Sequence, residues 1–559
     1  METTNITKRY QVCVLSWVLV GCLSVLVPNV VSAGTEVGLY DLWETQVTNS
    51  KSYSNPFDYN VIELRATFTS PTGSNTNFFG FYDGNGKGGQ NGNVWKLRFM
   101  PDKTGTWKYN YTWTDGTSGG SGSFNVVDTG LPGPLKVASD NPWYFMDSRN
   151  KPFHLRGYDL HGINYDNSHV STRTGGSIID EETRINRVID RDLVGNGYNF
   201  TMVMLEVDRT KKRPDAWGNR SFWINSSDKK RFDLPVWHTW ERIMTRLAKK
   251  KVYSITFAAM IAQKSEYSFS EFKIFLRYFV ARFGGYYNFF GWSPSWEWHD
   301  IWGGSEVNQV MSYVHSIDPW RRLLSNHDCS LNSFSSWLGF SMRQTPTRDI
   351  FKGNSRQAFW AQFEDRKKFC GQSGIGSKFV NKPIIGSEDH WEAPGGHNDQ
   401  PRNAREVRRG AWGSLMAGVL PLYSEWSIWI GGTGKGEQDF RRMFDFFYSK
   451  TKYREYKQLN SLVSKSGRQI ASGKEGLEYL VYDENGGSIT INLSGAGSSN
   501  TYDVLWYNPI TGTTQNGGKV KGGGSRTLYS PISGDTVLLL SKGKADTVPP
   551  KAPTGLMIR

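Results

Sequence analysis

The sequence is poor in cysteine and, after its first residues, contains no long hydrophobic run. Only four of its 559 residues are cysteine, and they form no metal-binding or redox motif, so we expect neither a metal ion nor another cofactor. Cys329 and Cys370 lie beyond the amino-terminal segment and form either one disulfide or two buried free thiols. The mean hydropathy is −0.52, which predicts a soluble chain without a transmembrane segment.

The first 33 residues have the pattern of an export signal. Lys8 and Arg9 precede an apolar run over residues 12–27, and Val-Ser-Ala at 31–33 offers small residues for cleavage. We therefore expect residues 1–33 to be a signal peptide and the protein to be secreted or periplasmic. Leu-Val-Gly-Cys at 19–22 also resembles a lipoprotein processing site, so a lipid anchor at Cys22 is the alternative.

The pattern of the chain changes twice, which predicts three domains. Residues 34–137 contain strand-like runs separated by Gly, Asn and Ser turns, which favours an immunoglobulin-like β-sandwich. Residues 138–454 alternate between strand and helix patterns, and residues 455–545 return to short strands, so a second β-sandwich is expected. Residues 546–559 are a Pro-rich linker or tail.

The middle block divides into eight strand–helix units. Segments with apolar residues at three- and four-residue spacing, typical of amphipathic helices, separate apolar runs of strand length. Eight such units close into a (β/α)8 (TIM) barrel. The expected strands are 153–159, 198–207, 252–260, 288–298, 321–328, 338–345, 382–389 and 419–426, and helical patterns include 180–194, 236–251, 270–283 and 305–317.

Polar and aromatic residues gather where these strands end, the edge that forms the functional face of such a barrel. Glu297 follows the fourth strand and Glu388 the seventh. Hydrolysis of a glycosidic bond needs two carboxyl groups, one to protonate the leaving oxygen and one to attack or assist at the sugar carbon. The candidates for substrate binding are Arg156, Asp159, His161, Glu206, Trp298, His299, Asn326, His327, Arg343, Gln344, Trp391 and Trp426. The alternative for any one of them is a loop-capping or supporting role.

These residues resemble glycoside hydrolase clan A. Its members place an acid at the end of strand four and a nucleophile at the end of strand seven, and KPIIGSE at 382–388 is similar to their nucleophile strand. The resemblance implies that Glu297 is the general acid/base and Glu388 the nucleophile of a retaining mechanism, with carboxyl groups about 5–5.5 Å apart. Many clan members carry Asn before the strand-four acid, where this chain has Trp296.

The whole of residues 34–545 also resembles a group of three-part secreted proteins. These combine an amino-terminal sandwich, an apiosidase-like barrel and a carboxy-terminal sandwich of the collagen-binding type. The sequence motifs GFYDG and WKLRF of this chain are similar to those of the amino-terminal sandwich. The resemblance is specific for architecture and less so for substrate.

The surroundings of the two carboxylates predict opposite protonation states. Glu297 should have a raised pKa because an apolar setting and a nearby carboxylate disfavour its charged form. Glu388 must stay ionised and needs hydrogen-bond donors, for which Arg156 and His327 are the candidates. The apolar setting of Glu297 is expected from Trp292, Trp296 and Trp298.

The charge balance suggests the substrate. The formal net charge is +14, and a basic cluster at residues 209–213 follows the second strand, with Arg343 and Arg348 after the sixth. Such a face attracts an anionic polysaccharide, for example a sulfated galactan of the carrageenan or agar type. The alternatives are a solvated loop in a glycosidase for neutral plant glycans, and a non-catalytic carbohydrate-binding scaffold. Nucleic acid is not expected, because no nucleic-acid-binding fold or basic helical stripe is present.

Overall fold

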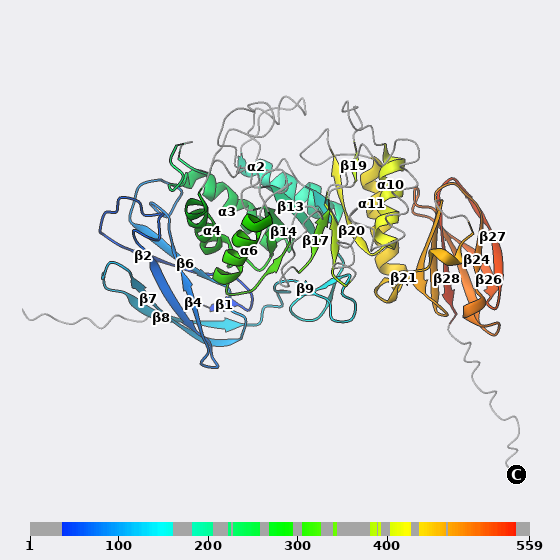
Figure 1. Cartoon of the computed structure of the whole chain (residues 1–559), viewed down its shortest axis with the longest axis horizontal. Helices are drawn as coiled ribbons and strands as arrows, with labels where there is room; N and C mark the ends of the chain where they lie inside the picture. Colours follow the sequence, from blue (N-terminus) through cyan, green and yellow to red (C-terminus); the bar gives the residue numbers. More distant parts are fainter. Residues whose placement is uncertain are drawn as a thin grey trace, which may run out of the picture.

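The structure of the protein is a computed structural model. It describes residues 36–159, 181–204, 222–224, 227–257, 268–293, 304–325, 339–343, 381–387, 390–392, 403–425, 435–464 and 468–543. Amino-terminal sheets, a central part of strands and helices, and carboxy-terminal sheets follow one another along the long axis (Figure 1).

The amino-terminal part consists of two facing sheets. One has the strand order β1-β8-β7-β3-β4 and the other β2-β6-β5. Aromatic rings fill the space between them: Phe68 stacks on Phe99 with ring centroids 4.1 Å apart, and Trp43 stacks on Phe124 at 4.6 Å. The part is therefore a β-sandwich. Its strands are β1 (Glu36–Gly38), β2 (Trp43–Thr48), β3 (Leu64–Thr69), β4 (Asn75–Phe79), β5 (Phe81–Tyr82), β6 (Val94–Phe99), β7 (Gly105–Trp113) and β8 (Gly120–Val127).

The core of the central part is a sheet of parallel strands. The strands pair in the order β16-β15-β14-β13-β12-β20-β18-β17, which is the neighbour order of a (β/α)8 barrel. All eight predicted strands are present within the described residues. Their bounds are β12 (Gly157–Asp159), β13 (Phe200–Met204), β14 (Tyr253–Phe257), β15 (Phe289–Ser293), β16 (Leu323–Leu324), β17 (Ser341–Arg343), β18 (Ile384–Gly386) and β20 (Val419–Glu425), and β19 (Trp391–Glu392) pairs with the end of β20.

Strand pairing in the described residues does not close this sheet into a ring. The open edges are β16 and β17, which are the first and last strands of the pairing order. The amide of Gly339, just before β17, nevertheless donates to the carbonyl of Leu324 at 2.9 Å. The two edges therefore adjoin, while full closure of the barrel stays a prediction.

The amino ends of the strands are closed by aromatic residues from a small sheet. This sheet contains β9 (Lys136–Val137), β10 (Phe145–Met146) and β11 (Pro152–Phe153). The fully buried Phe145 lies 5.0 Å from the ring of Phe290 in β15 and 6.0 Å from that of Phe340, which precedes β17. Because this end is filled, an open site has to be sought at the opposite, carboxyl-terminal edge.

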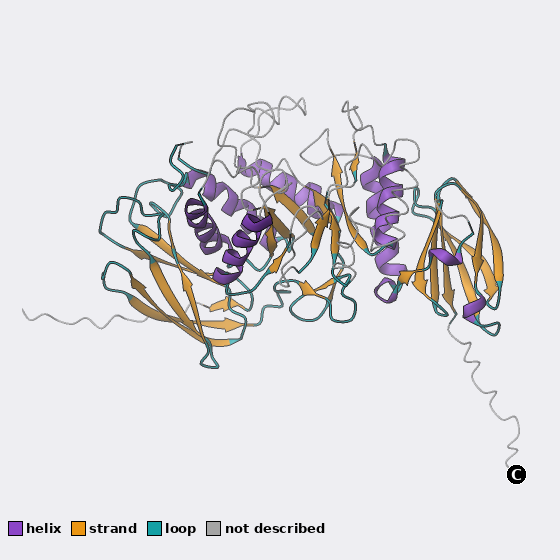
Figure 2. Cartoon of the chain, in the orientation of Figure 1, coloured by secondary structure: helices purple, strands orange, loops and turns teal. Residues whose placement is uncertain are grey.

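Helices flank the central strands (Figure 2). The helices α4 and α10 begin with capping boxes, in which Ser268 pairs with Glu271 and Asn403 with Glu406. The first predicted helix continues after six α-helical residues as a π-helix, η1 (Arg187–Leu193), and a short 3-10 turn, η2 (Val194–Asn196). The α-helices are α2 (Glu181–Asn186), α3 (Leu234–Lys249), α4 (Phe269–Phe283), α6 (Gly304–Ile317), α10 (Ala404–Met416) and α11 (Lys435–Lys450). None of the helices in the described ranges is long and apolar enough to cross a bilayer.

The carboxy-terminal part is again built from sheets. A six-stranded sheet, β21-β22-β23-β28-β25-β26, lies with the antiparallel pair β24-β27 around a separate apolar core that includes Tyr479, Ile489 and Tyr502. The strands are β21 (Lys457–Gln458), β22 (Gln469–Lys474), β23 (Glu478–Asp483), β24 (Gly486–Asn492), β25 (Thr501–Tyr507), β26 (Thr514–Lys521), β27 (Ser525–Ser533) and β28 (Thr536–Lys542).

Both terminal parts are joined to the central helices by buried contacts. At the amino-terminal junction, Arg98 of β6 forms ion pairs with Glu44 and Glu241 while almost fully buried. At the carboxy-terminal junction, Arg408 of α10 binds Asp535, and Trp412 stacks on Tyr482. In Figure 1 helices α10 and α11 accordingly lie between the central strands and the carboxy-terminal sheets.

Candidate functional site

Buried polar side chains line the carboxyl-terminal edge of the parallel sheet. Asp159 and Ser293 are the last residues of β12 and β15, Ser424 is the next-to-last residue of β20, and Ser325 and Ser387 directly follow β16 and β18. All five are buried. Buried polar groups are retained only with partners, so a row of them at one edge indicates an organised polar layer at the expected functional face.

Asp159 lies where the sequence predicted it, at the carboxyl end of the first barrel strand. Its Oδ2 accepts a hydrogen bond of 3.0 Å from the Ser424 hydroxyl on the neighbouring β20. The bond fixes the carboxylate at the junction of the first and eighth strands. A contact between Asp159 and substrate stays a prediction.

The chain makes an irregular step at the end of the seventh strand. β18 pairs with β20 up to the partners Gly386 and Pro421, and β19 resumes the pairing at Trp391 and Ser424. Trp391 comes five residues after Gly386, whereas Ser424 comes only three residues after Pro421. The seventh strand therefore has two extra residues opposite β20, as in an enlarged β-bulge. Bulges re-aim side chains and recur beside active sites.

Contacts on the far side of this step hold the chain in place. The His390 carbonyl accepts from the Ser424 amide at 3.2 Å, and its Nε2 lies 3.0 Å from the Ser414 hydroxyl of α10. Glu392 Oε2 accepts hydrogen bonds from the Tyr423 hydroxyl at 2.8 Å and from the Gly436 amide at 2.9 Å. Burial raises the pKa of Glu392, and these hydrogen bonds only partly oppose the shift.

Arg156 does not lie at the carboxyl edge, so this prediction is wrong. The first strand begins at Gly157, one residue after Arg156. The Arg156 guanidinium pairs with Asp445 near the carboxyl end of α11, and the distance between Nη1 and Oδ1 is 2.7 Å. Because barrel helices run back against the strands, that end of α11 marks the amino-terminal face. Arg156 therefore belongs to the amino-terminal face of the sheet and not to the carboxyl edge.

The role expected of Trp292 also needs correction. Its ring packs against Phe279 of helix α4, with centroids 5.4 Å apart, and its indole N–H donates to Asp318 Oδ2 at 2.9 Å. The side chain is thus part of the contact between sheet and helix rather than of an apolar surface at the strand end.

The remaining predicted residues divide into two groups. Arg343 ends β17 opposite Gly386, and Trp391 pairs with Ser424, so the backbone of both is at the carboxyl edge. The others lie outside the described residues: His161, Glu206, Glu297, Trp298, His299, Asn326, His327, Gln344, Glu388 and Trp426, as do the basic cluster 209–213, Arg348, Cys329 and Cys370.

Sequence reasoning missed three residues that organise this edge: His390, Glu392 and Tyr423. A second acidic residue four positions after Glu388 was a signal for Glu392, and a polar ring within the apolar run VLPLYSE was a signal for Tyr423. Neither signal identifies the partner, because Gly436 lies in a helix 44 residues further along the chain.

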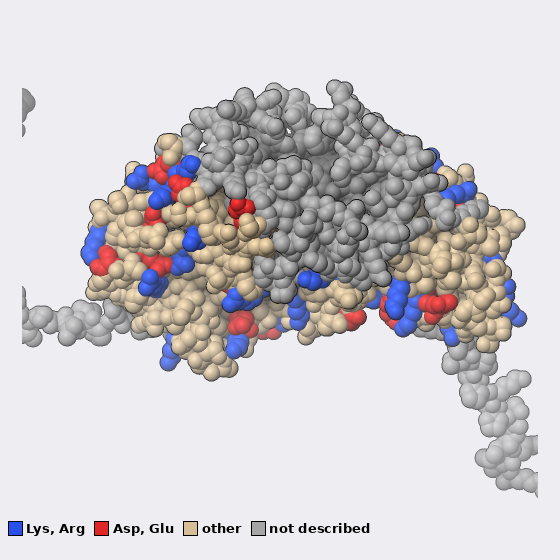
Figure 3. Space-filling view, viewed as in Figure 1, with Lys and Arg blue, Asp and Glu red and all other residues tan. Residues whose placement is uncertain are grey.

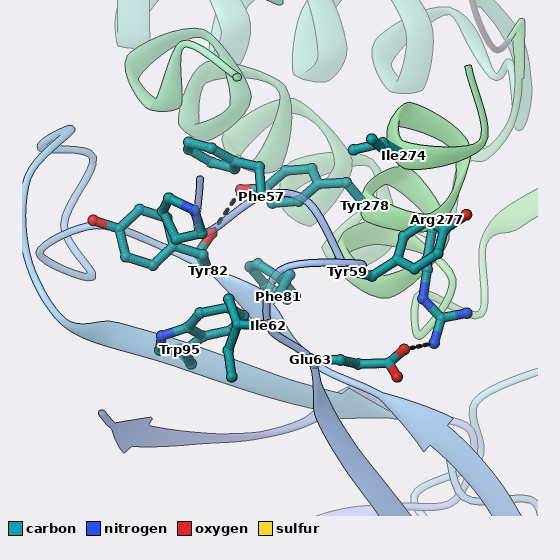
Figure 4. A pocket seen from close by; sticks show the side chains of 12 residues that line it. Phe57, Tyr59, Ile62, Glu63, Phe81, Tyr82, Trp95, Ile274, Arg277 and Tyr278 are labelled. Carbon is teal, nitrogen blue, oxygen red and sulfur yellow. Dashed lines mark hydrogen bonds and ion pairs between the residues drawn. The ribbon is translucent and has the colours of Figure 1, made fainter. Parts of the chain in front are cut away.

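The hollow between the amino-terminal sandwich and α4 is a poor alternative site. Aromatic residues line it, among them Phe57, Phe81 and Tyr278, and Arg277 reaches across to Glu63 (Figure 4). Eight of the twelve lining residues are buried, and the Tyr278 hydroxyl donates to the Tyr82 carbonyl. Tyr59 is the only partly exposed ring among the lining residues, and the other rings pack between sandwich and helix, so this hollow belongs to the junction between the two parts.

Residues 188–430 match the family model described as "Apiosidase-like, catalytic domain". The chain carries an apiosidase-like catalytic domain. Residues 36–114 match "Domain of unknown function (DUF5060)", and residues 460–541 match "Putative collagen-binding domain of a collagenase". The three-part arrangement that the sequence resembled is therefore confirmed. No curated protein matches the sequence.

Solved structures share the fold of this chain. A crystal structure described as a putative glycoside hydrolase from Bacteroides vulgatus is 17% identical, with a TM-score of 0.68 over 91% of this chain and 100% of its own. A glycoside hydrolase family 5 structure from the same organism is 16% identical, with a TM-score of 0.56 over 73% of this chain and 93% of its own. The chain thus has a glycoside-hydrolase-like fold.

Proposed function

We propose that the protein is an exported glycoside hydrolase that cleaves an extracellular polysaccharide with retention of configuration. The observation that carries the proposal is an apiosidase-like domain with a glycoside-hydrolase-like fold, in which two carboxylates follow the fourth and seventh parallel strands. Glu297 comes four residues after the end of β15, and Glu388 directly follows Ser387. In a (β/α)8 barrel both strand ends belong to the face that carries catalysis.

The two carboxylates have complementary roles in this mechanism. Glu297 gives its proton to the departing glycosidic oxygen while the Glu388 carboxylate bonds to the anomeric carbon, so the glycosidic bond breaks and a glycosyl ester forms. Glu297, now ionised, takes a proton from water, whose oxygen attacks the same carbon and releases Glu388. The polar layer at the carboxyl edge supports this chemistry, because ionised groups and sugar hydroxyls both need hydrogen-bond partners.

The proposed substrate is an anionic polymer such as a sulfated galactan. Its support is the net charge of +14 and the basic cluster at 209–213. On the described surface of the face in Figure 3, Lys and Arg are interspersed with Asp and Glu. The charge argument therefore depends on the cluster itself and not on a general basic face.

Release of reducing ends from a panel of purified sulfated, carboxylated and neutral polysaccharides tests this function. The wild type should release them from at least one polymer, preferably an anionic one, and Glu388→Gln should bind that polymer without releasing ends. Binding by both proteins without release would favour a carbohydrate-binding scaffold. Release from neutral glycans alone would support glycoside hydrolase activity and reject an anionic substrate.

A further inference from the structure

We infer that Glu392 is a positioning residue, which fixes the chain around the nucleophile by tying the segment after β18 to the amino terminus of α11. The inference rests on the proposed function, in which Glu388 is the nucleophile. It concerns a residue that itself stays buried behind the carboxyl edge, with only 4% of its surface exposed.

The need for an anchor follows from the irregular step after β18. Between Gly386 and Trp391 the chain is two residues longer than the facing part of β20. Pairing with β20 alone does not determine the path of such a stretch, because the two chains differ in length between the paired positions. Contacts on either side must therefore determine it, and Glu388 lies within this stretch by sequence.

Glu392 supplies such a contact through a single oxygen atom. Oε2 accepts from Tyr423 in β20 and from the backbone amide of Gly436, the second residue of α11. A carboxylate at this position satisfies an amide that has no partner within the helix, and it is favoured by the positive end of the helix dipole. One side chain thus joins the seventh strand, the eighth strand and the following helix.

Gly436 allows this close approach. A Cβ atom added there would lie 2.5 Å from Glu392 Oε2, which is far inside a normal contact distance. A larger residue at this position would therefore push the Glu392 carboxylate away from the amide, whereas glycine leaves room for the hydrogen bond.

His390 provides a second anchor between Glu388 and Glu392. Its carbonyl is bound by Ser424, and its ring contacts Ser414 and the ring of Phe440, with 5.6 Å between the ring centroids. The segment is therefore attached to α10, α11 and β20 within three residues. A displacement of about 1 Å at a reacting group costs on the order of 100-fold in rate, so anchors of this kind affect turnover directly.

The test compares Glu392→Ala, Glu392→Gln and a matched control, Glu478→Ala. Glu478 is a buried glutamate of the carboxy-terminal sheets, and its Oε1 likewise accepts from a backbone amide, that of Lys452, and from a tyrosine hydroxyl, that of Tyr456. We expect kcat of Glu392→Ala to fall by on the order of 10- to 100-fold with KM unchanged. Glu392→Gln keeps an accepting oxygen and should stay within about threefold of wild type, and Glu478→Ala should keep its kcat.

Hydrogen exchange of the peptide spanning residues 387–392 provides a readout that needs no activity. Glu392→Ala should speed exchange there, whereas Glu392→Gln and Glu478→Ala should not. Unchanged exchange in Glu392→Ala, or a kcat loss no greater than that of Glu478→Ala, would overturn the inference. Retained turnover in Glu388→Gln would instead reject the proposed nucleophile, and the exchange experiment would still decide whether Glu392 anchors the segment.

Discussion

The ends of β15 and β18 are held in the structure by different kinds of contact. Trp292 in β15 lies 4.4 Å from the ring of Phe289 and 5.4 Å from that of Phe279, in an aromatic layer against helix α4. The chain after β18 is held by polar contacts of His390 and Glu392. Packing of the first kind is shared among many atoms, and the hydrogen bond from the Trp292 indole to Asp318 lies between sheet and helix. The contacts after β18, by contrast, each depend on one donor and one acceptor at the strand end. The seventh strand end should therefore respond more sharply to single substitutions.

The largest effect should come from the carboxylate at the end of the seventh strand. Glu388→Gln should reduce turnover below about one hundredth of wild type while fold and polymer binding persist, because an amide of nearly the same shape cannot form the glycosyl ester. Reducing-end assays, circular dichroism and binding to the insoluble polymer check the three points together. Activity above that level would remove Glu388 from the mechanism.

The carboxylate after the fourth strand should show a loss that depends on the leaving group. Glu297→Ala should harm substrates with poor leaving groups most, by on the order of 100- to 10,000-fold, because proton donation to the departing oxygen is lost. Azide should restore part of the rate on activated substrates by replacing the missing base-assisted water. Equal losses on activated and natural substrates without azide rescue would contradict the assignment.

Substitution behind the fourth strand should affect stability and not catalysis. Trp292→Phe removes the indole donor of the buried Asp318, which should lower the free energy of unfolding by about 1–3 kcal/mol. Chemical denaturation measures this loss, and kcat at a temperature where the variant is folded should remain near wild type. A fall in kcat as large as that expected of Glu392→Ala would contradict the expectation that the seventh strand end responds more sharply to single substitutions.

The smallest effect should come from the basic cluster at 209–213, which belongs to neither of the two strand ends. Replacing Arg209, Lys211, Lys212 and Arg213 by Ser or Gln should raise KM on an anionic polymer and flatten its salt dependence, because exposed charges are screened over about 10 Å at 0.1 M ionic strength. Turnover at saturation should change less, since such contacts form equally in the ground and transition states. Unchanged KM and salt response would favour a neutral glycan.

Much of the central fold could be predicted from the sequence because it depends on periodicity. The run at 419–426 became β20 at Val419–Glu425, and the helical pattern at 270–283 became α4 at Phe269–Phe283. The first strand was placed less well. Residues 152–153 pair with β10 instead of the barrel, and an apolar pattern does not specify which partner a strand takes. The error in Arg156 follows from this shift of the strand start.

The candidate site could be predicted only in part because its residues are held by contacts between segments that are far apart in the sequence. Asp159 was found because a polar residue closes an apolar run, and its position depends on that run alone. Glu392 was missed because its function depends on Gly436 and Tyr423, whose approach is decided by the packing of α11 on β20. A glycine at the start of a helix has no sequence signal that links it to a carboxylate of another strand.

The most direct test of the account is the anomeric configuration of the sugar at the moment of release. Proton NMR of a hydrolysis time course, on the polymer that the panel identifies or on an oligosaccharide from it, distinguishes the first-formed anomer before mutarotation. A glycosyl ester on Glu388 requires two displacements at the anomeric carbon, so the first product should keep the configuration of the substrate. A first product of inverted configuration would contradict the double displacement and the assignment of Glu388 as nucleophile.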